Sequence, residues 1–145
     1  LNSEQNSGCA LYTEVQTKDK IVHIANFHGV AYHEDDKLDN HERLTRSREL
    51  INFFRHKDGF KIIGGDFNIL PETQSIRMFE ENGYVDLIKE FKIPTTRNRL
   101  AWKKHPVKML YSDYVFVSPD VKVKSFVVSN IEVSDHLPME LEIEL

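Results

Sequence analysis

The alternation of apolar and polar positions along the chain predicts a mixture of strands and helices. Short runs rich in β-branched and aromatic residues are typical of strands, and they occur at residues 10–16, 21–27, 60–63, 111–117, 121–128 and 139–145. The final run alternates strictly, with apolar Met139, Leu141, Ile143 and Leu145 around three glutamates. Such a strand should bury one face and expose the other to solvent.

Two longer segments have helical spacing. The first should begin at Asp39, as the N-cap of a capping box with Glu42, and should end near residues 57–59. The second should begin after the N-cap Thr73 and end with Gly83 at the C′ position. Their apolar faces are formed by Leu44, Leu50, Ile51 and Phe54 in the first and by Ile76 and Phe79 in the second. We expect a turn at residues 17–20, a short helical turn at 85–91, and loops at 30–38 and 92–108.

The stretch FKIIGGDFNIL at residues 60–70 joins a buried strand to a polar loop. Its apolar run ends at two glycines, and Asp66 and Asn68 follow two positions apart. If the backbone stays extended, the side chains of Asp66 and Asn68 point to the same face of the sheet. A carboxylate and a carboxamide at the end of a strand could hold a hard metal ion or face a reacting phosphate. The alternative is a plain turn, because Gly, Asp and Asn are common in turns for local reasons.

The composition describes an ordinary globular protein with one domain. The 145 residues are 40% hydrophobic and 29% charged, with a formal net charge of −4. No general positive charge therefore draws the chain to nucleic acid or an acidic membrane, and binding of a polyanion needs a local patch. The only cysteine is Cys9, which excludes an internal disulfide and favours a reducing, cytoplasmic location. No apolar run is long enough to span a bilayer, and no signal-peptide pattern opens the chain.

Further polar clusters lie near predicted strand ends. Asp113 lies inside the apolar run YSDYVFV, where a buried charge is costly without a partner, and His136 is the partner we expect. Residues 134–138 (SDHLP) precede the final strand, and His28 ends an early one. Each has a simpler alternative. Asp113 could accept backbone hydrogen bonds, His28 could be a satisfied loop histidine, and residues 134–138 could be only a turn that enters the strand.

Together these residues fit metal-assisted cleavage of a phosphoester. Carboxylate and amide oxygens suit Mg²⁺ or Mn²⁺, whereas zinc would prefer more His or Cys. A divalent ion would neutralise developing charge on the phosphate. A histidine held by a buried aspartate could donate to a phosphate oxygen or relay a proton. The candidate set is His28, Asp66, Asn68, Asp113, Asp135 and His136.

Four motifs in this order resemble the endonuclease/exonuclease/phosphatase superfamily, which has the DNase I-like fold. They are NFHG at residues 26–29, GDFN at 65–68, SDYVFVS at 112–118 and SDHLP at 134–138. The resemblance extends from about residue 10 to residue 145. It implies an α/β (α+β) fold that forms part of a four-layer α/β sandwich, and a Mg²⁺- or Mn²⁺-dependent hydrolase of phosphoesters, of nuclease or phosphatase type.

The resemblance also implies a role for each candidate residue. Asp66 is similar to the aspartate that orients or deprotonates the attacking water, and Asn68 to the amide that positions water and phosphate. His136, held by Asp113, resembles the histidine that contacts the scissile phosphate, as general base or as transition-state stabiliser. His28 resembles a second active-site histidine of the DNase I-like branch. The metal ligands implied are Asp66, Asn68 and Asp135, the last directly or through water.

One family feature is missing from the sequence. The family's principal metal ligand is a glutamate in the first half of the domain, usually in a Gln-Glu-type motif, and Glu4 and Glu14 lie in the wrong context. We therefore expect residues 1–8 to be a flexible tail and residues 9–145 to be the C-terminal part of the domain, with the N-terminal half absent. A truncated gene product is the expected explanation, and the alternative is that another chain supplies the missing half. The isolated chain should then be weak or inactive, with one sheet face uncovered and available for self-association.

The substrate is suggested by the segment 92–108, which has no acidic residue. Arg97, Arg99, Trp102 and Lys103 are the predicted substrate-binding residues. A basic segment with an aromatic side chain can follow a nucleic-acid backbone and stack on a base, which slightly favours nucleic acid over inositol or lipid phosphates. The same residues could also grip a phosphorylated headgroup or form a solvated loop. A second class of function is a catalytically incomplete binding module of the same fold that recognises a phosphorylated ligand or a partner.

Overall fold

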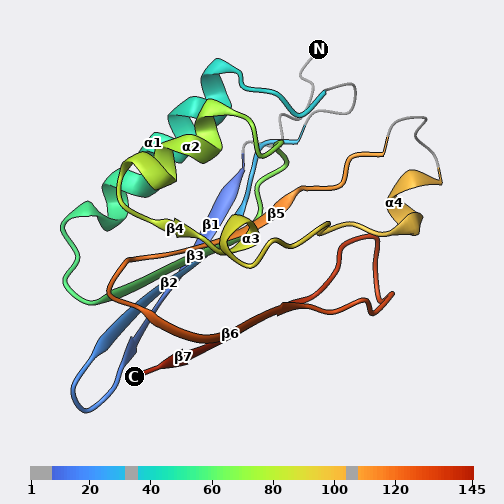
Figure 1. Cartoon of the computed structure of the whole chain (residues 1–145). Coiled ribbons are helices and arrows are strands. Elements are labelled where there is room, and N and C mark those ends of the chain that lie inside the picture. The colour runs from blue at the N-terminus through green and yellow to red at the C-terminus, as the bar shows by residue number, and fades with distance from the viewer. Residues whose placement is uncertain (1–7, 32–35, 104–107) are drawn as a thin grey trace.

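The computed structural model describes residues 8–31, 36–103 and 108–145, whose elements form three layers (Figure 1). Helices α1 (His41–Arg55) and α2 (Gln74–Glu81) lie on one side of a five-stranded sheet, and a two-stranded sheet lies on the other. The five strands are β1 (Cys9–Gln16), β2 (Ile21–His28), β3 (Phe60–Asp66), β4 (Val85–Asp86) and β5 (Asp113–Val117). The second sheet consists of β6 (Lys122–Val128) and β7 (Met139–Glu144), and two short helices are α3 (Leu87–Glu90) and α4 (Arg99–Trp102). Apart from Gly8, the predicted tail lies outside the described residues.

The order of strands in the large sheet is β1-β2-β3-β5-β4. Strands β2 and β3 are parallel and are connected through α1, whereas β5 runs antiparallel to β3. The C-terminal ends of β2 and β3 and the start of β5 therefore lie side by side, at the edge of the sheet that is formed by strand ends. At this edge Asp66 pairs with His28 on one side and with Asp113 on the other. The topology thus gathers three of the predicted site residues.

An aromatic cluster fixes helix α2 to the sheet. Phe67, which directly follows β3, has its ring centroid 5.6 Å from those of Phe79 and Tyr114 and 5.5 Å from that of Phe116. Phe79 of α2 stacks on Phe116 at 4.3 Å. All four rings are buried, and each pair of this kind contributes about 0.5–1.5 kcal/mol beyond its buried area. The GDFN segment is therefore held by the core through its phenylalanine.

The start of α1 differs from the prediction, whereas α2 begins after Thr73 as predicted. The N-cap of α1 is Asn40, whose side chain accepts a hydrogen bond from the Arg43 amide at 2.9 Å, so the assignment of Asp39 as N-cap is wrong. Asp39 instead caps α2, accepting from the amides of Gln74 and Ser75 and from the Ser75 hydroxyl. Thr73 is the N-cap residue of α2 but makes no capping bond with its side chain.

Other local predictions have mixed outcomes. Gly83 follows the C-cap of α2 at φ +86°, which confirms its C′ position. Residues 85–91 contain strand β4 and then α3, and the segment predicted as a loop at 92–108 contains α4. Strand β7 half-buries Met139, Leu141 and Ile143 and exposes its glutamates, as predicted. Leu145 lies beyond the strand and is exposed.

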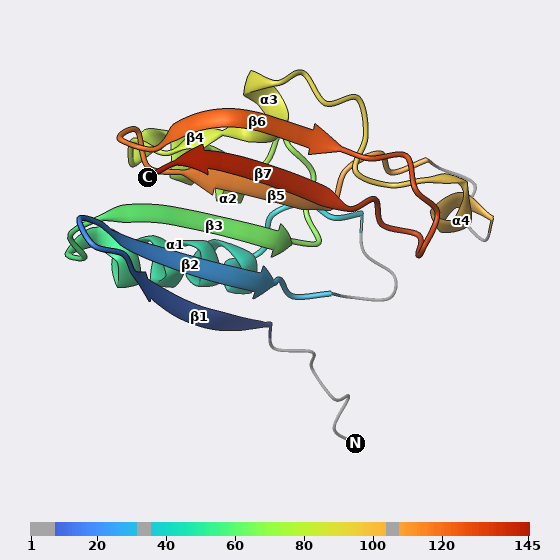
Figure 2. The same ribbon diagram turned by 90° about the horizontal axis from the view of Figure 1, so that it is seen from below.

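The face of the large sheet opposite the helices is only partly covered. Strands β6 and β7 lie over the β5 side of this face, while β1 and β2 have no described element above them (Figure 2). Leu11 and Val15 of β1 point to the uncovered side and are 68% and 42% exposed. The predicted uncovered sheet face is therefore present over β1 and β2, and self-association through it stays a prediction. Among the described residues, no helix has the length and apolar character needed to cross a membrane.

Candidate active site

Asp66, Asp113 and His136 form one cluster at the sheet edge. One donor atom from each lies within 4.8 Å of the others. Asp66 ends β3, Asp113 begins β5, and His136 comes from the segment that leads into β7. Three separate parts of the chain thus supply two carboxylates and an imidazole to one position.

Asp113 orients the imidazole of His136. Both oxygens of its carboxylate contact Nδ1, at 2.9 and 3.0 Å, and Asp113 is 6% exposed. This hydrogen bond raises the pKa of His136, while burial and the positive charge of Arg97 oppose the rise. With Nδ1 protonated and held, Nε2 lies 3.7 Å from Asp66 Oδ2. The imidazole is therefore set to exchange a proton at Nε2, on the side of Asp66.

Asp66 is fixed through its other oxygen. Oδ1 accepts from the Ser112 hydroxyl at 2.5 Å and from the Asn68 amide at 2.9 Å, which leaves Oδ2 facing His136. Gly65 precedes it at φ +134°, and a Cβ there would lie 2.1 Å from the Phe27 carbonyl oxygen. Only glycine fits this position, which explains part of the GDFN motif.

Asn68 does not follow an extended backbone. The strand ends at Asp66, and Asn68 has φ +54°, a left-handed conformation that asparagine tolerates. The expectation that Asp66 and Asn68 share a face of an extended strand is therefore wrong. The Asn68 side chain is 9% exposed and donates to the Gly29 carbonyl at 3.4 Å. It connects the Asp66 turn to the end of β2.

Arg97 reaches the cluster from the segment before α4. Its guanidinium lies 3.1 Å from His136 Nε2 and donates to Asp135 Oδ2 at 2.5 Å. The Arg97 side chain is 14% exposed, and its Nε is buried with no hydrogen-bond partner among the described residues. Asp135 is thus held by Arg97, and Arg97 faces the same imidazole nitrogen as Asp66. A buried guanidinium with an unsatisfied N–H suits an anion.

The other predicted site residues lie outside the cluster. His28 is exposed at the end of β2, beside Asp66 in the sheet register. Arg99, at the start of α4, is paired with Glu132 through bonds of 2.7 and 2.8 Å. Trp102 donates to the Met109 carbonyl and has Lys108 over its ring at 5.3 Å, while Lys103 is exposed. Of the four predicted substrate-binding residues, Arg97 is the one that contacts the cluster.

Two residues at the cluster were not predicted. Ser112 bonds Asp66, and Lys37 Nζ donates to the Ser112 hydroxyl oxygen at 2.9 Å. Burial, followed by the charge of Arg97, lowers the pKa of Lys37. Ser112 belongs to the SDYVFVS motif, but a single serine hydroxyl gives no sequence signal of its own. Lys37 lies in the segment 30–38, which was predicted as a loop, and no sequence pattern there distinguishes a lysine that points inward.

Asp66, Asp113 and His136 are the described residues whose ligand atoms lie close enough to hold a metal ion together. Asp66 Oδ2 faces the cluster, whereas both oxygens of Asp113 are occupied by His136. Asp135 is bound by Arg97, and the Asn68 side chain donates to the Gly29 carbonyl, so the role of both as metal ligands stays a prediction. Glu14, on β1, accepts from the Tyr12 hydroxyl and lies 3.6 Å from His23, away from the site. The described residues of the cluster thus include no glutamate.

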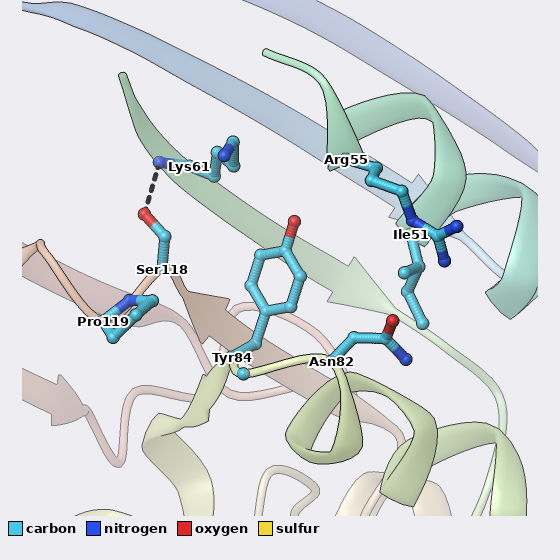
Figure 3. Close-up of a pocket in the computed structure, with 8 residues that line it drawn as sticks. Ile51, Arg55, Lys61, Asn82, Tyr84, Ser118 and Pro119 are labelled. Atoms are coloured by element: carbon cyan, nitrogen blue, oxygen red, sulfur yellow. Dashed lines mark hydrogen bonds between the residues drawn. The ribbon is translucent and has the colours of Figure 1, made fainter. Parts of the chain in front are cut away.

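A separate pocket of about 150 Å³ lies at the opposite end of β3 (Figure 3). The ring of Tyr84 stands in its middle, between Lys61 of β3 and Arg55 of α1. Burial raises the pKa of Tyr84 to about 12. Arg55 belongs to the last turn of α1, where a cation offsets the negative end of the helix dipole. This pocket contains none of the predicted site residues.

The amino-acid sequence matches the model of one protein family. Residues 3–136 match the family model described as the Endonuclease/Exonuclease/phosphatase family. The chain belongs to this family. No curated protein matches the sequence.

Solved structures share the fold of this family member. A functionally unknown conserved protein from Enterococcus faecalis V583 is 18% identical with a TM-score of 0.71, over 93% of this chain and 55% of its own. Mannosyl-6-phosphatase Bt3783 from Bacteroides thetaiotaomicron is 22% identical with a TM-score of 0.65, over 94% and 57%. D. rerio TDP2, complexed with a single-strand DNA product, is 15% identical with a TM-score of 0.67, over 95% and 62%. The chain thus has the DNase I-like α/β fold and spans little more than half the length of these structures.

Proposed function

We propose that the chain carries the site of a divalent-metal-dependent phosphoester hydrolase, of the nuclease or phosphatase type. The observation that carries this proposal is the alignment of Asp113, His136 and Asp66 at one sheet edge. A carboxylate that fixes an imidazole, with a second carboxylate opposite Nε2, suits in-line attack of water on phosphorus. Family membership supports the same reaction class.

The residues have distinct parts in this proposal. Asp66 Oδ2 orients the attacking water and accepts its proton, and protonated His136 donates Nε2–H to a phosphate oxygen. Arg97 has to leave His136 Nε2 when the imidazole is protonated, because both groups are then cationic donors. A bound Mg²⁺ or Mn²⁺, held by oxygens of Asp66, Asn68 and Asp135, would neutralise charge on the phosphate. His28 and Asn68 position the water and the substrate.

The remaining parts of the proposal concern substrate and location. Arg97 and exposed Lys103 support a nucleic-acid substrate slightly over inositol or lipid phosphates. Exposed Cys9, the only cysteine, supports a reducing, cytoplasmic location.

The test is hydrolysis of a generic phosphodiester, plasmid DNA and inositol phosphates by the 145-residue chain with Mg²⁺. We expect slow turnover that EDTA and Asp66→Asn both abolish, slow because the described cluster holds no glutamate. Asp120→Asn, an exposed carboxylate after β5, is the control variant and should change nothing. Mg²⁺-dependent binding without turnover would support the binding-module alternative, and neither binding nor turnover would contradict the proposal.

A further inference from the structure

The backbone of Lys37, next to the site, has an unfavourable conformation. Its φ is +59°, a left-handed conformation that is unfavourable for a residue with a Cβ by about 1–2 kcal/mol. The Leu70 amide donates to its carbonyl oxygen at 3.0 Å, which ties this conformation to the segment after GDFN. Strain of this kind is commonly kept where a side chain has to point into a functional site.

The side chain of Lys37 points to Ser112 and, through it, to Asp66. Lys37 Nζ donates to the hydroxyl oxygen of Ser112, which donates in turn to Asp66 Oδ1 at 2.5 Å. The ammonium is therefore one hydroxyl away from the carboxylate proposed to orient the attacking water. Burial and the nearby charge of Arg97 disfavour the ammonium, while Asp66 and Asp113 favour it. Two cations held near one another at a reactive edge are stabilised by a bound anion.

We propose that Lys37 contacts a non-bridging oxygen of the substrate phosphate and makes the site prefer terminal phosphate esters to internal diesters. This inference rests on the proposed function. The attraction between a lysine and a phosphate is proportional to the charge of the phosphate. A terminal ester has a second pKa of about 6 and carries almost two negative charges at neutral pH, whereas a diester carries one. Lys37 thus contributes about twice as much energy to binding the terminal ester.

The test measures binding of methyl phosphate and dimethyl phosphate to the 145-residue chain by calorimetry, with Mg²⁺ at about pH 8. Wild type should bind methyl phosphate more tightly. Lys37→Met should weaken methyl phosphate about tenfold and dimethyl phosphate about threefold, since the energy lost follows the ligand charge. Lys37→Arg should keep most of the preference. Lys61→Met, a change at the far end of β3, should alter neither affinity.

The outcomes separate this inference from the function on which it rests. Equal losses for the two esters in Lys37→Met, or no loss, would overturn the role of Lys37 while wild-type binding still supported the phosphate site. If wild type binds neither ester, both proposals are overturned. Because a variant could lose its fold, the Lys37 side-chain NMR signals of wild type give a second measurement. They should shift on addition of methyl phosphate, and unchanged signals at saturation would contradict the contact.

Discussion

Asp113 and His136 form the central contact of the site, although 23 residues separate them in the chain. Asp113 is nearly fully buried at the start of β5, and His136 lies in the segment that joins β6 and β7 of the second sheet. The bond between them connects the two sheets at the edge where Asp66 lies. It fixes which imidazole nitrogen faces the substrate position.

Replacing Asp113 should change the titration of His136. Asp113→Asn removes the carboxylate that raises the pKa of His136, so this pKa should fall. NMR titration of the imidazole signals measures the shift. Asp135→Asn is the control, since Asp135 contacts Arg97 rather than the ring, and should shift the pKa much less. An unchanged His136 pKa in Asp113→Asn would contradict the assigned hydrogen bond.

The same pair should also make stability depend on pH. The folded-state pKa of His136 is raised, so its stabilising contribution is fully present below the unfolded pKa of about 6.5. It is lost as pH rises through the folded pKa. Urea unfolding should show wild type losing stability over this window relative to Asp113→Asn. Parallel pH profiles for the two proteins would count against the contribution.

Asp39 should stabilise α2 although it precedes a different helix. Asp39→Ala leaves two amides and the Ser75 hydroxyl without their acceptor, and should lower the free energy of unfolding by about 1–3 kcal/mol. Thr73→Ser is the matched control, because it keeps the Thr73 hydroxyl that bonds the Leu70 carbonyl. Chemical denaturation measures both. A loss in Asp39→Ala no larger than in Thr73→Ser would contradict the cap.

The sequence predicted the features that depend on local pattern. The burial of Phe60 and Ile63 in β3, the alternation of β7 and the end of α2 at Gly83 follow from hydrophobic period and turn chemistry. The pairing of Asp113 with His136 was predictable because a charge in an apolar strand requires a partner.

Other features depend on contacts between distant segments. Asp39 and Asn40 are both good N-cap residues, and the approach of α2, over 30 residues later, decides which one caps which helix. Arg97 and Lys37 lie in polar segments, so no periodicity shows that they point inward. The left-handed turn at Asn68 likewise includes a bond to the carbonyl of Gly29, which follows β2.

Ionisation of Asp86 should lower the stability of the folded state. Burial raises its pKa to about 6 from 3.8, so the folded state holds the proton that the unfolded state releases. Stability should therefore fall as pH rises from about 4 to about 6, by about 1–3 kcal/mol. Asp86→Asn keeps an N-cap for α3 and should remove this fall. Denaturation of both proteins across this range checks it, and identical slopes would contradict the assignment.

The uncovered sheet face should mediate association with a second copy of the chain. β1 is an edge strand whose exposed Leu11 and Val15 form an apolar surface there. Leu11→Lys should shift the protein toward monomer in light scattering. Val133→Lys, which alters an equally exposed residue of another segment, should leave the mass unchanged. A monomeric wild type would contradict the prediction.

The most direct test of the metal-supported phosphate site is where Mn²⁺ binds. Paramagnetic Mn²⁺ broadens NMR signals near it. As Mn²⁺ is added, we expect the signals of the His136 imidazole and the Ser112 amide to broaden before others. Asp66→Asn should remove this effect. Broadening confined to the exposed glutamates of β7, or unchanged in Asp66→Asn, would contradict a metal site at the edge formed by β3 and β5.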